Sequence, residues 1–105
     1  MASIEGYRYD IDRYYSIKDK LYRIASALEQ SSQSAGRLNQ ETSSSYQIDN
    51  DPTIISERIG TLGQDMSDTA SHIRRVIIPA IDDAIYYSKR EIERLEEEEE
   101  EDEDD

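Results

Sequence analysis

Apolar residues recur every eleven residues along the second half of the chain. Eleven of the twelve positions in this repeat are apolar; its three rows are Ile55, Met66, Ile77 and Ser88, then Ile59, Ala70, Ile81 and Ile92, then Leu62, Ile73, Ala84 and Leu95. Eleven residues over three turns give about 3.67 residues per turn, close to the natural period of an α-helix. The pattern therefore predicts a long helix over residues 53–95, with an apolar stripe that it cannot bury alone.

The first half of the chain carries a heptad-like stripe. Its apolar residues are spaced by three, four or seven; they are Tyr14, Ile17, Leu21, Ile24, Leu28, Ala35 and Leu38. This spacing predicts a first helix over about residues 7–45, and Ser3 is a candidate cap for an earlier start. Residues 30–47 are rich in Ser, Gln and Asn. They form either the softer half of this helix or a partly disordered linker.

A strong turn signal separates the two stripes. The run Asp49-Asn50-Asp51-Pro52 predicts a turn over about residues 46–52. Asp51 suits the cap of the next helix and Pro52 its first position. The chain is thus expected to be all-α, an antiparallel two-helix hairpin over residues 1–95. Contacting residues should have numbers that sum to about 100, so that Ile59 lies near Leu38, Ile78 near Leu21, and Ile85 near Tyr14.

Two kinds of helix-breaking residue interrupt the second stripe. Gly60 and Gly63 lie near its start, and we expect them to allow close packing against the first helix, since each costs about 1 kcal/mol in a helix interior. Pro79 removes a main-chain hydrogen bond to the carbonyl of Arg75. Because the apolar repeat continues through Pro79, a kink over about residues 75–79 is expected rather than an end to the helix.

The net charge of −13 comes mostly from one segment. The last ten residues, 96–105, are all acidic, which predicts a disordered, solvated tail. Such acidity disfavours nucleic acid and anionic membrane as partners, and the apolar run 76–81 is too short for membrane insertion. The start of the chain has no basic and apolar segments typical of a signal peptide. We expect a cytoplasmic protein, with export without a cleaved signal peptide as the alternative.

The hairpin is expected to pair with further helices. The apolar surplus and seven of the eight tyrosines fall towards the open end; either they surround a two-helix seam, or they form a partner-binding patch. The residues expected to contact a partner are Tyr14, Leu21, Ile77, Ile78, Ile81, Ile85, Tyr86 and Tyr87. The partner would be another helical protein or a second copy, giving a heteromer or a homodimer built as a four-helix bundle.

The sequence offers little for catalysis. His72 is the only histidine and the chain has no cysteine, so no catalytic triad, metal cluster or thiolate chemistry is indicated. Asp82 and Asp83 are adjacent, and adjacent helical side chains diverge by about 100°. We therefore expect no enzyme activity, no cofactor and no metal site.

The architecture resembles the small WxG-type proteins of type VII secretion and, more closely, the helical partner proteins that accompany LxG-type toxins. The resemblance covers residues 7–95. It implies an export signal of the form Tyr-x-x-x-Asp/Glu near the end of the second helix, where Tyr87-Ser-Lys-Arg-Glu91 stands. Tyr15 and Asp19 match the same spacing, and the family's Trp motif is absent.

The resemblance implies a non-enzymatic interaction protein, a secretion partner, chaperone or substrate of a type VII-like system. The alternative is a self-associating coiled-coil structural or assembly protein, for example a phage component.

Overall fold

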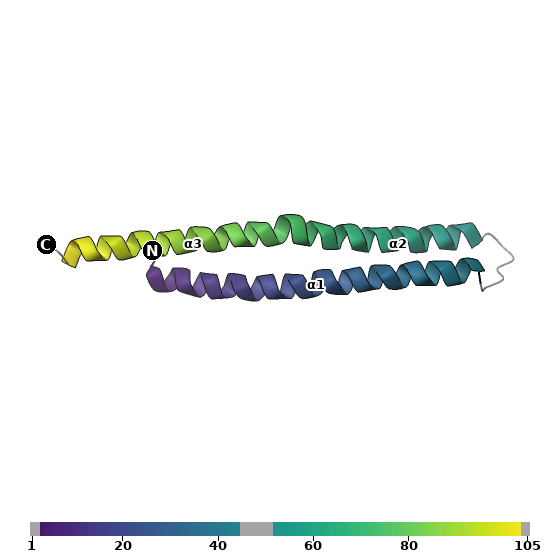
Figure 1. Ribbon diagram of the computed structural model, residues 1–105, viewed down its shortest axis with the longest axis horizontal. Helices are drawn as coiled ribbons and strands as arrows, with labels where there is room; N and C mark the ends of the chain where they lie inside the picture. The colour runs from purple at the N-terminus through teal and green to yellow at the C-terminus, as the bar shows by residue number, and fades with distance from the viewer. Residues whose placement is uncertain (1–2, 45–51, 104–105) are drawn as a thin grey trace. The chain divides into compact units, whose positions relative to one another are not determined.

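The computed structural model describes residues 3–44 and 52–103, and these form an all-α helical hairpin, as predicted. Helix α1 is Ile4–Ser44, α2 is Pro52–His72, a π-helical turn η1 is Ile73–Ile77, and α3 is Ile78–Glu103 (Figure 1). The chain divides into two compact units. Unit 1 comprises Met1–Leu21 and Val76–Asp105, and unit 2 comprises Tyr22–Arg75.

Both described helix starts follow from their sequences. Ser3 caps α1, since its Oγ accepts a hydrogen bond of 3.0 Å from the Gly6 N–H and its carbonyl accepts one of 2.9 Å from the Tyr7 N–H. Helix α1 therefore begins at Ile4, earlier than the predicted residue 7. Helix α2 begins at Pro52, as predicted. Apart from Pro52, the turn predicted over about residues 46–52 lies outside the described residues, as does the Asp51 cap.

Two segments for which the sequence indicated partial or complete disorder are helical. The Ser- and Gln-rich stretch belongs to α1 as far as Ser44, so the helical interpretation holds there and the linker is wrong. The acidic run was expected to lack structure, but α3 continues through it to Glu103. Extending an existing helix avoids the cost of nucleation, and Glu is a good helix former. Arg94 also neutralises part of the run by pairing with Glu98 at 2.6 Å.

The interior face of α1 follows a strict heptad. Its buried and half-buried residues alternate at spacings of three and four; the a positions are Ile4, Ile11, Lys18, Ala25, Ser32 and Asn39, and the d positions are Tyr7, Tyr14, Leu21, Leu28 and Ala35. The predicted stripe was right for Tyr14, Leu21, Leu28 and Ala35. It was wrong for Ile17, Ile24 and Leu38, which are exposed. The heptad position next to them holds small or polar residues that pack at the interface between the helices.

The second helix shows two heptad stretches separated by the π-helical turn. In the first stretch the a positions are Ser56, Gly63 and Ala70 and the d positions are Ile59, Met66 and Ile73, the last of which is the first residue of η1. In α3 the a positions are Ile78, Ile85 and Ile92 and the d positions are Ile81, Ser88 and Leu95. Ile73 and Ile78 are five positions apart, one more than the four-residue step from d to a in a heptad, and η1 begins at Ile73 and ends at Ile77. The eleven-residue repeat had treated both stretches as one continuous pattern, and it therefore predicted that Ile55 and Leu62 face the first helix. That prediction is wrong, since both residues are exposed.

Within each unit, α1 runs antiparallel to the second helix in the predicted register. In unit 2, Asn39 accepts a hydrogen bond from Ser56 at 2.7 Å, and Glu29 pairs with Arg74 at 2.6 Å. In unit 1, Lys18 pairs with Asp82 at 2.6 Å. We call the interface formed by the a and d positions the seam. The main chain continues as a helix through Pro79, as predicted. The departure from α-helical geometry lies just before Pro79, in the π-helical turn η1.

Candidate interaction surface

One side of the unit 2 seam carries an ion pair. Glu29 and Arg74 each directly follow a d residue, and they meet beside the seam. Arg74 Nε donates to Glu29 Oε1 at 2.6 Å, while its Nη2 donates to Ser26 Oγ at 3.1 Å. The same guanidinium lies 5.8 Å from the centre of the Tyr22 ring. We call this side, formed by the residues that follow d positions, the charged flank.

The opposite side of the unit 2 seam is apolar. We call it the apolar flank; it consists of Ile24, Leu38, Ile54, Ile55 and Leu62. Four of them directly precede an a residue and thus occupy g positions, whereas Ile54 occupies the preceding f position, about 100° further round α2 from Ile55. In an antiparallel pair, residues that follow d on both helices share one side, as Glu29 and Arg74 do, so the g residues share the other. All five apolar residues are 43% to 56% exposed.

The seam that these residues flank is thin. The a positions of unit 2 are all small or polar; they are Ala25, Ser32 and Asn39 on α1, and Ser56, Gly63 and Ala70 on α2. The larger apolar side chains instead sit at d and g. The apolar face of each helix therefore extends from the d positions of the seam to the g positions of the apolar flank. Of this face, packing of the two helices against each other buries the d residues only. The g residues stay exposed and can contact another helix.

The two glycines of α2 behave differently. Gly63 is buried, and a Cβ at this position would lie 3.4 Å from the Ala35 Cβ and 3.6 Å from the Ser32 carbonyl oxygen. The predicted close packing is therefore confirmed for Gly63. It is wrong for Gly60, which is exposed and whose nearest neighbour would be the Asn39 amide nitrogen at 3.8 Å.

The predicted partner-binding residues lie in unit 1, and two of them are not available to a partner. Ile78 and Ile85 are 3% and 5% exposed, because they occupy a positions of the seam. This corrects the expectation that they form an open surface. Four others are half-buried along the same interface; they are Tyr14, Leu21, Ile77 and Ile81. Only Tyr86 and Tyr87 of that set are well exposed.

Exposed tyrosines of unit 1 are covered by cations. Arg13 lies 5.6 Å from the centre of the Tyr9 ring, and Arg90 lies 5.8 Å from that of Tyr86. Lys89 lies 5.7 Å from the Tyr15 ring centre and also donates to its hydroxyl at 3.2 Å. Each ring therefore has a face occupied by a positive charge. The apolar surface of unit 1 is smaller than its tyrosine content indicated.

The candidate export motif belongs to a packed cluster in unit 1. The Tyr87 ring meets the Tyr7 ring edge-on, with centres 6.5 Å apart, and Glu91 accepts from Arg94 at 2.8 Å and 3.0 Å. Burial raises the pKa of Tyr7, and the neighbouring Tyr87 and Glu91 add to this. The hydrogen bond from Arg94 to Glu91 raises the pKa of the Arg94 guanidinium. Tyr87 and Glu91 thus have structural contacts of their own.

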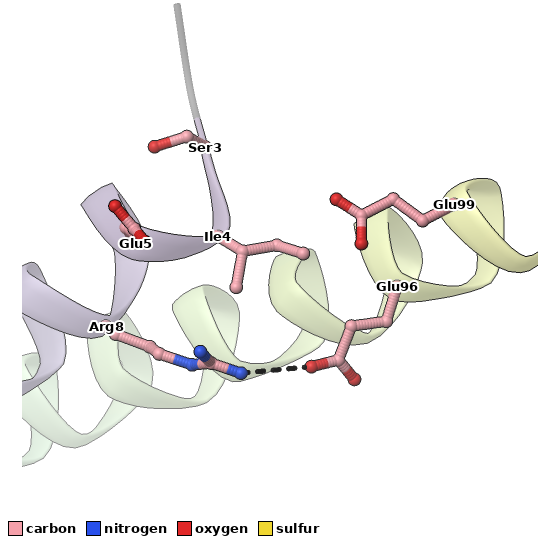
Figure 2. Close-up of a pocket in the computed structure, with 6 residues that line it drawn as sticks. All are labelled: Ser3, Ile4, Glu5, Arg8, Glu96 and Glu99. Carbon is pink, nitrogen blue, oxygen red and sulfur yellow. Dashed lines mark hydrogen bonds and ion pairs between the residues drawn. The ribbon is translucent and has the colours of Figure 1, made fainter.

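One pocket of unit 1 is open to solvent and is lined mainly by charged residues. Figure 2 shows this pocket, where the start of α1 and the acidic part of α3 are bridged by the ion pair of Arg8 with Glu96 at 3.3 Å. Glu5 and Glu99 also line it, so its character is mainly acidic. No group of three metal-ligating side chains occurs within residues 3–44 and 52–103, and His72 is an exposed surface residue, as predicted.

Among the helices of the described residues, none combines the length and the hydropathy that crossing a bilayer requires. No protein-family model, curated protein or solved structure matches the chain. The apolar flank therefore has to be interpreted from its own chemistry.

Proposed function

We propose that this chain is a non-enzymatic interaction module, which binds another helical segment along the apolar flank of unit 2. One observation carries the proposal, namely that both helices of unit 2 place large apolar residues on the same exposed side. Helices recognise helices through such rows, because apolar residues at regular spacing fit the grooves of a facing helix. The charged flank, with its ion pair and its cation over Tyr22, offers no comparable surface.

A partner within a type VII-like secretion system is the finer form of this proposal. Its support is the two-helix architecture and the Tyr-x-x-x-Glu spacing of Tyr87 and Glu91 on α3, ahead of the acidic run. If Glu91 completes an export signal, Glu91→Gln abolishes release into the medium and leaves the folded chain intact inside the cell. Asp19→Asn, at the second match to the same spacing, is the control and leaves release unchanged.

Site-specific photo-crosslinking in the native cell tests the general proposal. A photoreactive amino acid is placed at Leu62 on the apolar flank or, as the matched control, at Ser67. Both positions are exposed in α2, but Ser67 follows a d residue and faces the charged flank. We expect one discrete adduct from Leu62 and none from Ser67. Equal, diffuse labelling at both positions would contradict the proposal.

A further inference from the structure

We propose that the occupant of the apolar flank is the apolar flank of a second copy of this chain, related by a two-fold axis at the level of Leu62. This inference rests on the proposed function, since it names the partner of the same surface. It is carried by the spacing of apolar residues, by the position of two opposite charges, and by the distribution of net charge between the units.

The apolar residues that α1 contributes to this flank are placed symmetrically about one level of unit 2, whereas the g row of α2 has Ile55 on one side of Leu62 and Thr69 on the other. Ser32 Oγ donates to the Gly63 carbonyl at 2.7 Å, so the g residues that precede them, Ser31 and Leu62, lie at the same level on the two helices. On α1, Ile24 and Leu38 lie seven residues to either side of Ser31. A two-fold axis perpendicular to the helices at this level places Ile24 of one copy against Leu38 of the other, twice. Leu62 then meets Leu62 of the second copy.

The charges beside this surface match the same axis. On α2 the c positions adjoining the g row hold Arg58 and Asp65, one on each side of Leu62, and both are exposed. The two-fold axis that passes between the two Leu62 side chains places Arg58 of each copy next to Asp65 of the other. On α1 the corresponding c positions hold Ala27 and Ser34, which are small and uncharged. The apolar row of α1 and the charged c row of α2 are therefore each complementary to themselves about this axis.

The net charge favours contact between copies at unit 2. Residues 22–75 contain five Lys and Arg against seven Asp and Glu, a net charge of −2, so the remaining −11 of the chain belongs to unit 1. Two strongly acidic surfaces repel each other, whereas two nearly neutral ones do not. A basic partner would be drawn to unit 1. The nearly neutral apolar flank instead suits an identical surface.

Sedimentation equilibrium of the full chain tests the inference. The expected species has twice the monomer mass of 12.1 kDa. Arg58→Asp sets like charges against each other twice and should weaken the dimer by roughly tenfold or more. The double variant Arg58→Asp/Asp65→Arg restores opposite charges and should recover the dimer. Asp68→Arg, an exposed charge reversal one turn away from Asp65 and off the c row, is the matched control and leaves dimerisation unchanged.

Two results would overturn the inference. One is a monomer at protein concentrations of about 100 μM, where even a weak specific dimer with a micromolar dissociation constant forms. The other is a dimer that Arg58→Asp and Leu62→Glu leave equally strong, since it would use another surface. The crosslinking experiment separates this failure from that of the proposed function. A Leu62 adduct with a different protein would contradict the homodimer but support the proposed interaction module. The absence of any adduct would contradict both proposals.

Discussion

The Ser32 hydroxyl donates a hydrogen bond of 2.7 Å to the carbonyl oxygen of Gly63 on the facing helix. This contact requires the two backbones to approach closely, which the missing side chain of Gly63 and the small side chain of Ala35 allow. The a positions of the unit 2 seam thus allow close backbone approach, while the larger side chains of the seam, such as Leu28 and Met66, lie at d positions. Further large apolar side chains lie outside the seam, on the apolar flank.

Substitutions at the two glycines of α2 should have opposite effects. Gly63→Leu forces a branched side chain against Ala35 and Ser32 and should cost about 1–3 kcal/mol of unfolding free energy. Gly60→Leu is the matched control, since Gly60 is exposed and Leu is the better helix former, so stability should rise by about 0.5–1 kcal/mol. Urea denaturation measures both. Equal effects at the two positions would show that Gly63 is not a close-packing site.

The sequence predicted the helices better than it predicted their faces. Periodicity located both helices and their antiparallel register, because apolar spacing and Pro52 are local signals. It misplaced Ile17, Ile24 and Leu38, because a stripe drawn through the largest apolar residues assumes that these residues form the seam. Here small residues such as Ala25 and Gly63 form it. The signal that could have located the seam is the heptad spacing of Ala25 with Ser32 and of Ala35 with Leu28.

The apolar flank was missed for the same reason. Counting apolar residues placed the surplus at the tyrosine-rich end, where cations in fact cover several rings and where Ile78 and Ile85 are buried. Which apolar residue faces outward depends on the rotation of the helix about its own axis. A shift of one residue in the heptad assignment turns each side chain by about 100°. The π-helical turn shifts that phase by one residue, and the eleven-residue repeat concealed the shift by averaging over it.

Removing the acidic run should change stability little and salt dependence more. Truncation after Leu95 deletes Glu96, whose ion pair with Arg8 is largely exposed, and such pairs contribute about 0–1 kcal/mol. The deleted carboxylates repel one another and oppose the dipole at the end of α3. Thermal melting at low and high NaCl should therefore show salt stabilising the full chain more than the truncated one. A stability loss above about 2 kcal/mol would mean that the run docks firmly.

Tyr7 should make the folded chain sensitive to alkaline pH. Burial raises its pKa above the ordinary 10.0, so the folded chain favours the neutral phenol. This contribution is fully present below the unfolded-state pKa and is lost as pH rises through the raised folded-state value. Tyr7→Phe keeps the ring against Tyr87 and removes the ionisable hydroxyl. The melting temperature of the wild type should fall relative to that of Tyr7→Phe above about pH 10, and a constant difference would refute this.

Pro79 lies at the start of α3, directly after the π-helical turn, and either the proline or the spacing of buried residues maintains that turn. The proline lacks the N–H that an α-helix would donate to Arg75. The spacing argument is independent of it, because the buried Ile73 and the buried Ile78 are five positions apart. A regular α-helix, in which d and the next a position are four residues apart, would rotate one of these isoleucines out of its seam. We therefore expect the turn to persist in Pro79→Ala.

The same substitution should raise the free energy of unfolding by about 1–3 kcal/mol, because Ala returns a main-chain hydrogen-bond donor and is a much better helix former than Pro. Dimerisation should not change, since Pro79 belongs to unit 1 and the apolar flank to unit 2. Asp83→Ala, exposed in the same helix, controls for helix propensity alone and should gain only a few tenths of a kcal/mol. Thermal melting, sedimentation and a crystal structure of Pro79→Ala provide the three readouts. An uninterrupted α-helix with Ile73 and Ile78 both still buried would show that the proline, and not the spacing, makes the π-helical turn.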